Sequence, residues 1–355
     1  MEYLSENRKE SHMAKANELE SIARAIVAPG KGILAADESF PTIEKRFKSI
    51  DVDSTEDNRR AYREMLFTTP GIGDHVSGVI LFDETVRQSA ADGRPFPRVL
   101  EEAGVIPGIK VDTGAKPLAG AEGEKVTEGL DGLRERLAEY RELGAKFTKW
   151  RAVIEIGDGI PSAYCIHVNA HALARYAALS QEAGLVPIVE PEVLMDGEHT
   201  IERCYEVTEA TLESVFNELF SQRVVYERML LKPNMVLPAK DCPKQASPEE
   251  VAEATVRCFR SVVPAAVPGI VFLSGGQSDE QATANLNAIN KRGEQPWELS
   301  FSYGRALQAP ALKAWRGEEA NLGAGQDAFA LRARLNGAAR SGEYTPEMEK
   351  VATAA

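Results

Sequence analysis

The sequence has few cysteines and no long apolar run. Its four cysteines, at positions 165, 204, 242 and 258, are too scattered for a CxxC pair and too few for a disulfide framework, so we interpret them as reduced packing residues. The longest apolar stretch, residues 262–273, contains two prolines and a glycine and is far shorter than the roughly 18 to 20 residues of a membrane-spanning helix. The N-terminal MEYLSENRKESH is charged where a secretory signal would be apolar. We therefore expect a cytoplasmic protein with no membrane partner.

An excess of positive charge is also missing. The chain has 41 Lys and Arg residues against 54 Asp and Glu residues, which gives a net charge of -13. A nucleic-acid-binding protein normally presents a basic face, so we expect no nucleic-acid partner. A small anionic substrate is still compatible with this charge, because basic residues that converge on one site can oppose the global field.

What the sequence does have is a regular alternation of strand and helix patterns. Nearly continuous apolar segments, typical of parallel strands covered on both faces, occur at KGILAAD, VSGVILF, IPGIKVD, AKFTKWRA, LVPIVEPE, RMLLKPNMV, GIVFLSGG and WELSFSYGR. Helical patterns lie between or after them, at residues 130–143, 163–183, 200–219, 248–259 and 328–340. This alternation predicts right-handed βαβ units and a parallel sheet.

We predict one (β/α)8 TIM barrel domain over residues 1–355. It would carry an N-terminal helix at about residues 12–27 and a C-terminal helix plus flexible tail at about residues 322–355. An open doubly wound sheet is the alternative. The barrel is favoured because it needs eight strands, and because the unusual polar residues lie near the C-terminal ends of these strands, where barrels place their active sites.

Charged residues interrupt five of the predicted strands. An isolated buried charge is expensive, so each of these residues needs a partner or a task. Alternate residues of a strand share one face, which puts Lys149 with Arg151 and opposite Trp150. A purely structural ion-pair network is the alternative, although buried pairs are poor stabilisers. The charged set that we expect at one end of the barrel is Asp37, Lys110, Lys149, Arg151, Glu190, Glu192 and Lys232.

Lys232, in LLKPNMV, is the candidate nucleophile. Its flanking leucines and the positive charge of Lys149 should favour the neutral amine. A neutral lysine attacks a ketone, and the resulting iminium is an electron sink that permits cleavage of the adjacent carbon–carbon bond. Glu190, held by Lys149, is the candidate acid and base for the carbinolamine steps. Asp37 could take the proton from the hydroxyl whose carbon becomes an aldehyde; the alternative for Asp37 is an ordinary loop or capping carboxylate.

Two clusters are candidate phosphate sites. Glycines let backbone N–H groups approach an anion, a helix N-terminus favours negative charge, and barrels often bind phosphate after strands seven and eight. The first cluster comprises Ser274, Gly275, Gly276, Ser302, Gly304 and Arg305. The second comprises Ser39, Thr42, Arg46 and Lys110, with Arg151 as a further expected substrate contact. Alternatively, the basic residues of this second region form a solvated face, namely Lys45, Arg46, Arg59 and Arg60.

The sequence resembles the class I fructose-bisphosphate aldolases. The motifs GKGILAADES, EDNRR, GIKVD, KWR, VEPE, LLKPNMV, FLSGGQS and FSYGRALQ occur in that family's order, from about residue 14 to about residue 346. The resemblance implies reversible cleavage of fructose 1,6-bisphosphate to dihydroxyacetone phosphate and glyceraldehyde 3-phosphate, in glycolysis and gluconeogenesis. It implies no metal or other cofactor, a Schiff base on Lys232, and a homotetramer. It further implies acid and base catalysis by Glu190 with support from Asp37 and Lys149, and phosphate contacts from Arg46, Ser274, Gly275, Gly276, Ser302 and Arg305.

The chain departs from the family pattern at two places. Phe40 and Pro41 follow AADES, where many relatives have Thr and Gly, so the distal phosphate pocket is expected to differ in shape. Animal and plant relatives end in a tyrosine that aids proton exchange on the enamine, whereas this chain ends in Ala355 and its last tyrosine is Tyr344. The sequence leaves open whether fructose 1-phosphate or sedoheptulose 1,7-bisphosphate is also preferred.

Three other functions compete with this interpretation. A metal-dependent aldolase needs histidines that converge on zinc, and the sole pair at helical spacing, His167 and His171, falls on a helix away from the strand ends. We expect those histidines at the surface or an interface. A transaldolase-like barrel would also use a Schiff base, but paired phosphate clusters favour a bisphosphate. A scaffolding protein would not need an intact set of ionisable residues.

Overall fold

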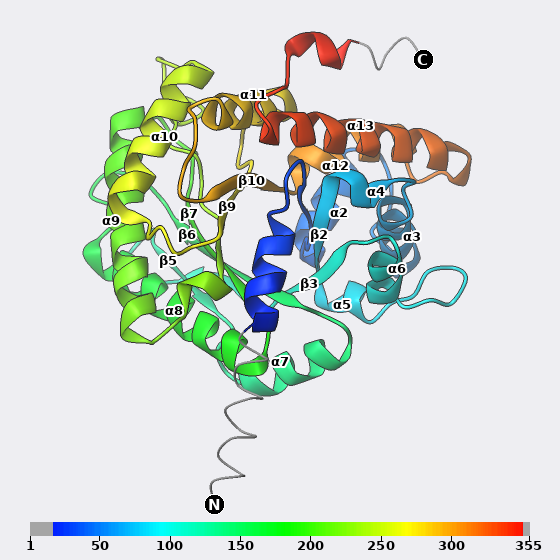
Figure 1. Ribbon diagram of the computed structural model, residues 1–355, viewed down its shortest axis with the longest axis horizontal. Helices are drawn as coiled ribbons and strands as arrows, with labels where there is room; N and C mark the ends of the chain where they lie inside the picture. The colour runs from blue at the N-terminus through cyan, green and yellow to red at the C-terminus, as the bar shows by residue number, and fades with distance from the viewer. Residues whose placement is uncertain (1–16, 351–355) are drawn as a thin grey trace, which may run out of the picture.

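The computed structural model describes residues 17–350, and its central element is a closed barrel of parallel strands surrounded by helices (Figure 1). The strands follow the barrel order β1-β10-β9-β8-β7-β6-β3-β2. The predicted barrel is confirmed, and the open doubly wound sheet is wrong because β1 pairs with both β2 and β10. The barrel strands are β1 (Gly32–Ala36), β2 (Val76–Leu81), β3 (Ile106–Lys110), β6 (Phe147–Ile154), β7 (Val186–Val193), β8 (Leu230–Leu231), β9 (Gly269–Phe272) and β10 (Glu298–Tyr303).

Helices follow the strands and cover the outside of the barrel. Several begin at a side-chain cap: Ser162, Thr200, Ser247 and Ser278 each accept an N–H from the first turn of the helix that follows. The helices are α2 (Phe40–Lys48), α3 (Glu56–Phe67), α4 (Ile72–His75), α5 (Asp83–Val86), α6 (Phe96–Glu102), α7 (Leu133–Glu142), α8 (Ala163–Ala183), α9 (Ile201–Ser221), α10 (Pro248–Val262), α11 (Asp279–Asn290), α12 (Arg305–Trp315) and α13 (Leu322–Arg340). The 3₁₀ turns are η1 (Tyr226–Arg228), η2 (Glu319–Asn321) and η3 (Pro346–Glu349).

Side chains alternate along each strand between the barrel interior and the outer helices, and those that point inward form successive layers. Phe147 of β6 belongs to an inner apolar cluster, whereas Trp150 packs outward against Tyr176 of α8. Ile188 of β7 is paired in register with Leu230 of β8, and both belong to the inner cluster. Two residues further along each chain, the same inward face carries Glu190 and Lys232. The interior is therefore apolar toward the N-terminal ends of the strands and charged toward their C-terminal ends.

The N-terminal helix closes the apolar end of the barrel. It is described from residue 17 to residue 26, and its Leu19, Ala23 and Ile26 are buried in the inner cluster with Phe147. Figure 1 shows this helix, in dark blue, across the end of the barrel. The first residues of the predicted helix, 12–16, lie outside the described residues. No helix within residues 17–350 is long and apolar enough to cross a membrane.

The C-terminal segment after α13 packs back onto the fold as far as it is described. Tyr344 is buried, and its hydroxyl donates to Glu349 Oε1 over 3.0 Å. Glu349 in turn receives two hydrogen bonds from Arg332 of α13, over 2.7 and 2.8 Å. Helix α13 includes the helical pattern at residues 328–340 and begins at residue 322, where the C-terminal helix and tail are expected to begin. The predicted flexible tail includes residues 351–355, which lie outside the described residues.

A hairpin that the sequence analysis did not predict lies between β3 and β6. It consists of β4 (Gly114–Pro117) and β5 (Lys125–Glu128), which pair antiparallel. Thr127 Oγ1 donates to the carbonyl of Arg151 over 2.8 Å. The hairpin therefore supports the C-terminal end of β6, where two of the predicted site residues lie.

Candidate active site

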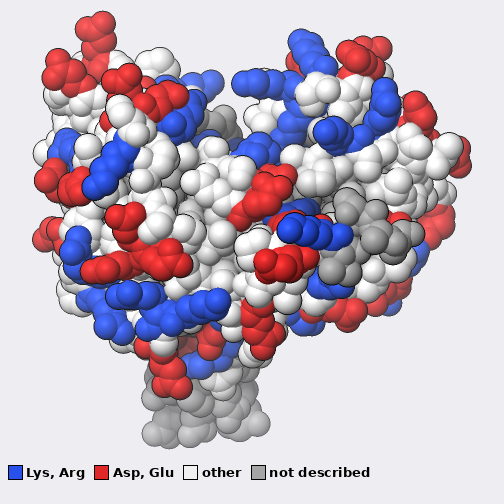
Figure 2. All heavy atoms as spheres, turned by 90° about the horizontal axis from the view of Figure 1, so that it is seen from above, with Lys and Arg blue, Asp and Glu red and all other residues white. Residues whose placement is uncertain are grey.

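A cavity of about 1090 Å³ lies at the C-terminal ends of the strands. Figure 2 shows a notch in the outline of the molecule with Lys and Arg side chains on both of its walls. All predicted site residues line this cavity. They come from different strand ends: Asp37, Ser39, Thr42, Arg46, Lys110, Lys149, Arg151, Glu190, Lys232, Ser274, Gly275, Gly276, Ser302, Gly304 and Arg305.

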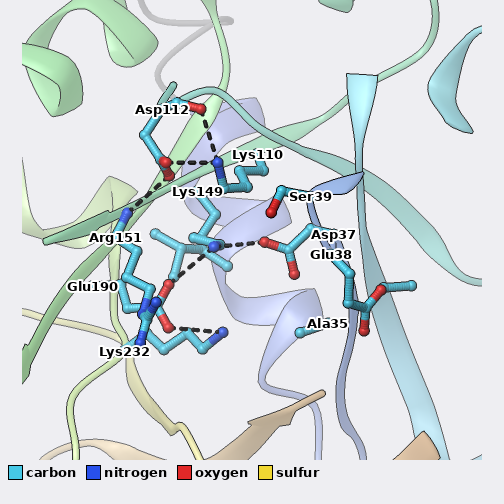
Figure 3. Close-up of polar contacts among 12 residues, drawn as sticks. Ala35, Asp37, Glu38, Ser39, Lys110, Asp112, Lys149, Arg151, Glu190 and Lys232 are labelled. Carbon is cyan, nitrogen blue, oxygen red and sulfur yellow. Dashed lines mark hydrogen bonds and ion pairs between the residues drawn. The ribbon is translucent and has the colours of Figure 1, made fainter. Parts of the chain in front are cut away.

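A chain of four alternating charges lies inside the barrel (Figure 3). Lys149 Nζ is 2.6 Å from Asp37 Oδ2 and 3.2 Å from Glu190 Oε2. The other oxygen of Glu190, Oε1, is 3.1 Å from Lys232 Nζ. All four side chains are buried or nearly so. The structure thus brings together the four residues that the sequence analysis selected for proton transfer and nucleophilic attack.

Burial and charge pairing shift the pKa values of these groups in opposite directions, and charge pairing has the larger effect. Burial alone would raise the pKa of Asp37, but the ammonium groups of Lys149 and Lys232 hold it well below its usual range. Burial would likewise raise the pKa of Glu190, but Lys149, Lys232 and Arg151 lower it. Burial would lower the pKa of Lys149, but Asp37 and Glu190 raise it. Asp37 and Glu190 are therefore carboxylates at neutral pH, ready to accept protons.

Lys232 lies just past the end of β8 rather than inside a long strand. Its N–H donates to the carbonyl of Val189 over 2.8 Å, and Pro233, which lacks an N–H, ends the pairing. Of its flanking leucines, Leu230 faces the barrel interior and Leu231 the outer core. The neutral amine that the sequence analysis expects for Lys232 stays a prediction.

Asp112 holds two basic residues of the cavity wall, Lys110 and Arg151, in place. Its Oδ1 is 2.6 Å from Lys110 Nζ, and its Oδ2 accepts the backbone N–H of Arg151 over 3.2 Å. Arg151 also pairs with Glu192, with 2.5 Å between Nε and Oε2, and this carboxylate raises the pKa of the guanidinium. The sequence analysis did not select Asp112, although it ends the GIKVD motif two residues after Lys110.

The predicted first phosphate cluster consists of residues from the loop after β9 and from the end of β10 and the start of α12. Gly275 adopts φ 55°, in the left-handed region that favours glycine. Arg305 donates to Asp279 Oδ1 over 3.3 Å and to the carbonyl of Gln277, so its guanidinium lies beside the loop. The buried Ser302 hydroxyl has no hydrogen-bond partner within residues 17–350. A buried donor without a partner is the kind of group that a bound ligand satisfies.

The second cluster lies across the cavity, at the start of α2. Ser39 Oγ and Thr42 Oγ1 are 3.2 Å apart, and Arg46 pairs with the buried Glu38. Glu38 also pairs with Arg63 over 2.6 Å and accepts from Gln308 Nε2 over 2.7 Å. Glu38 was missed by the sequence analysis, because its partners Arg63 and Gln308 are distant in sequence.

Two arginines of the alternative solvated face, Arg59 and Arg60, do not line the cavity, and their side chains are only 14% and 31% exposed because each is paired with a carboxylate. Arg59 pairs with Glu84 over 2.5 Å, and Arg60 pairs with Glu64 over 2.5 Å. The unusual Phe40 is 49% exposed and packs edge-on against Phe82, with ring centroids 5.3 Å apart. The departure from the family pattern therefore adds an aromatic contact at the rim of the cavity, since Phe82 lines it.

His167 and His171 lie on the exposed side of α8, away from the cavity. Both face Glu218 of α9, at 3.8 and 3.2 Å from their Nδ1 atoms. Within residues 17–350, no group of three or more His, Cys, Asp or Glu side chains could hold a metal ion.

Comparisons with known proteins agree with this geometry. The family model for class-I fructose-bisphosphate aldolases matches residues 18–355. A probable class 1 fructose-bisphosphate aldolase of Xanthomonas campestris is 61% identical over 92% of this chain and 98% of its own length. A cytosolic fructose-bisphosphate aldolase of Arabidopsis thaliana is 56% identical over 92% of this chain and 84% of its own. The fructose-bisphosphate aldolase of Plasmodium falciparum, solved in complex with TRAP and a small-molecule inhibitor, superposes with a TM-score of 0.92 at 48% identity, over 94% of this chain and 96% of its own. The chain belongs to the class-I fructose-bisphosphate aldolase family.

Proposed function

We propose that this protein cleaves fructose 1,6-bisphosphate reversibly into dihydroxyacetone phosphate and glyceraldehyde 3-phosphate, through a Schiff base on Lys232 and without a metal. The observation that carries the proposal is the buried chain Asp37–Lys149–Glu190–Lys232 in a cavity that the residues of both candidate phosphate clusters also line. Class I aldolases work without a metal, so the chemistry falls to these side chains.

Lys232 and Glu190 would form the Schiff base. The Lys232 amine attacks the ketone carbon, and loss of water from the carbinolamine gives the iminium. Glu190, 3.1 Å from the lysine nitrogen, is within reach to take a proton from this nitrogen and to give it to the carbinolamine hydroxyl, which then leaves as water. Its lowered pKa keeps it in the basic form before the reaction begins.

Asp37 would act as the base for cleavage of the carbon–carbon bond. As a carboxylate it takes the proton of the substrate hydroxyl whose carbon becomes the aldehyde, and the electron pair of the broken bond moves into the iminium to give an enamine. Lys149 touches both Asp37 and Glu190 and keeps both ionised. Tyr344 donates to Glu349 and is not one of the described residues that line the cavity, so we propose no role for it in proton exchange on the enamine.

The two phosphates would bind at opposite walls of the cavity. Support for one comes from the loop of Ser274, Gly275 and Gly276 with the guanidinium of Arg305 beside it. Support for the other comes from the second cluster, Ser39, Thr42, Arg46, Lys110 and Arg151, all of which line the same cavity.

The proposal also covers the domain organisation, the cellular location and the oligomeric state of the protein. We propose a single-domain cytoplasmic enzyme, because the curated plant relatives are named cytosolic or cytoplasmic isozymes. We also propose a homotetramer, on the resemblance to the family. Sedimentation equilibrium would then give about four times the 38.7 kDa chain mass.

Borohydride trapping tests the mechanism. Borohydride added with dihydroxyacetone phosphate should inactivate the enzyme irreversibly and leave the three-carbon adduct on the peptide that contains Lys232. Lys232→Met should abolish trapping, whereas Lys110→Met, which removes another lysine of the same cavity, should still be trapped at higher ligand concentration. Activity should persist in chelator. An adduct on another lysine would overturn the assignment.

A further inference from the structure

Met195 contacts the loop that we propose as a phosphate-binding site. The contact is unusual because it is a hydrogen bond to a thioether sulfur. Its thioether sulfur accepts the backbone N–H of Gly276, with 3.0 Å between N and Sδ. A Cβ built on Gly276 would lie 3.1 Å from the same sulfur, and one built on Gly275 would lie 3.4 Å from it. The methionine therefore occupies the space directly beside both glycines, on the side that faces the cavity.

The backbone of Met195 is fixed, whereas its side chain is adaptable. Its carbonyl accepts the N–H of Lys240 over 2.9 Å, and the N–H of the preceding Leu194 donates to Ile154 over 2.9 Å. Gly197 accepts from the N–H of Asp241 over 3.1 Å. Methionine is unbranched, with three rotatable bonds and a soft thioether, so its sulfur can leave the loop by rotation alone.

A thioether is a weak hydrogen-bond acceptor, whereas an N–H bond to a phosphate oxygen is charge-assisted and roughly twice as strong as a neutral bond. A phosphate that binds the Gly276 N–H must displace the sulfur, because both acceptors need the same donor. We infer that Met195 is a specificity-determining residue whose thioether holds the Gly276 N–H until the substrate phosphate replaces it. The inference rests on the proposed phosphate role of this loop.

The replacement of the Met195 sulfur by a phosphate oxygen should affect the affinity of the site for phosphate. Phosphate binding includes the loss of the sulfur contact, so removal of the sulfur should strengthen binding of a phosphate. The gain should be small, about two- to fivefold, as expected for one weak hydrogen bond. A ketone that lacks a phosphate does not reach the loop, so its affinity should stay the same. Met195 would therefore set how strongly the site distinguishes phosphorylated from unphosphorylated ketones.

The test compares Met195→Leu and Met195→Ala with the wild type and with Met65→Leu, which makes the same chemical change at a buried methionine packed against Gly325, away from the cavity. Inorganic phosphate binding is measured by calorimetry. The concentration dependence of borohydride trapping is measured with dihydroxyacetone phosphate and with dihydroxyacetone. Thermal unfolding checks that each variant is folded.

We expect phosphate and dihydroxyacetone phosphate to bind about two- to fivefold more tightly to both Met195 variants, with dihydroxyacetone and the Met65→Leu enzyme unchanged. If Met195 is instead a packing wall for the phosphate, affinity falls from wild type to Leu to Ala, and the inference is wrong. Unchanged affinity, or equal shifts for both ketones, also overturns it. Failure of trapping in the wild type would refute the Schiff-base proposal alone, since phosphate calorimetry does not depend on Lys232.

Discussion

At the scale of single residues, the site depends on Lys149, which binds two buried carboxylates at once. Removing one partner of a buried pair costs more than the pair itself contributes, because the remaining charge loses its compensation. Here the loss would leave Asp37 without its nearest cation and Glu190 with Lys232 as its remaining ion-pair partner and Arg151 nearby. Lys149 therefore acts both on stability and on the protonation of the two groups that we propose as proton acceptors.

We predict that Lys149→Met lowers the free energy of unfolding at pH 7 by about 3 to 5 kcal/mol. Asp37 and Glu190 have lowered pKa values in the folded protein, so their contribution is present above the ordinary carboxyl range near pH 4 and is lost as the pH falls through the folded values. The stability difference between wild type and variant should accordingly shrink below about pH 4. Urea unfolding at several pH values measures this difference.

The same substitution should change the pH–rate profile. Without Lys149, burial raises the pKa of Glu190, so the acidic limb of kcat/KM should move to higher pH and kcat should fall by about 10² to 10⁴. Lys110→Met provides the matched comparison, since Lys110 pairs with Asp112 outside the central chain. It should raise KM and move the acidic limb little. An acidic limb that is identical in wild type and Lys149→Met would contradict the role given to Lys149.

The central charged residues could be predicted from the sequence because strand alternation is local. Lys149, Glu190 and Lys232 stand out as charges within apolar strands, and the barrel brings strand ends together. Glu38, Asp112 and the sulfur contact of Met195 could not be predicted in this way. Each has a partner that only the closed barrel brings close: Arg63 for Glu38, the Arg151 N–H for Asp112, and Gly276, 81 positions along the chain, for Met195.

At the scale of elements, the apolar layer of the barrel depends on glycines that leave space for one aromatic ring. Phe147 of β6 lies against Gly108 of β3 and Gly78 of β2, and a Cβ on Gly108 would lie 2.3 Å from the Phe147 ring. Gly108 pairs in register with Phe147, two residues before the pair Lys110 and Lys149. The fit of this layer therefore sets the separation of the strands that carry both lysines.

We predict that Gly108→Ala destabilises the protein by about 1 to 3 kcal/mol through overpacking, and that it lowers kcat/KM because β3 and β6 move apart. The double variant Gly108→Ala/Phe147→Leu should recover part of both losses, since the smaller side chain removes the clash. Chemical denaturation and steady-state kinetics measure the two effects. Strictly additive losses in the double variant would show that the ring contact is not their cause.

The elements could be predicted well where they are long and periodic, and poorly where tertiary contacts define them. Helix α8 occupies the predicted residues 163–183, because its boundaries carry local signals, a Ser162 cap and Gly184 in the left-handed conformation. Strand β8 is shorter than its apolar segment, since Pro233 cannot continue the pairing. The hairpin β4–β5, with the sequences GAKP and KVTE, has one buried residue, Thr127, and therefore gives no hydrophobic periodicity to detect.

At the scale of the whole molecule, the net charge and the cavity have opposite effects on an anionic substrate. The chain carries a net charge of -13, yet as many basic as acidic side chains line the cavity. The Debye length is about 8 Å at 0.15 M ionic strength, so surface carboxylates farther away than this act weakly on a phosphate inside the cavity. The nearby guanidinium and ammonium groups should therefore control the affinity.

We predict that the KM for fructose 1,6-bisphosphate rises several-fold as KCl is increased from about 0.05 to about 0.5 M, because salt screens the attraction of each phosphate to its basic cluster. The KM for fructose 1-phosphate, which engages one cluster, should rise less, and kcat should change little because the Asp37–Lys149–Glu190–Lys232 chain is buried from salt. Arg305→Gln should reduce the slope of log KM against log salt for both substrates. A KM that falls with salt would mean instead that repulsion by the acidic surface dominates, and the two cationic walls would then not be the main source of affinity.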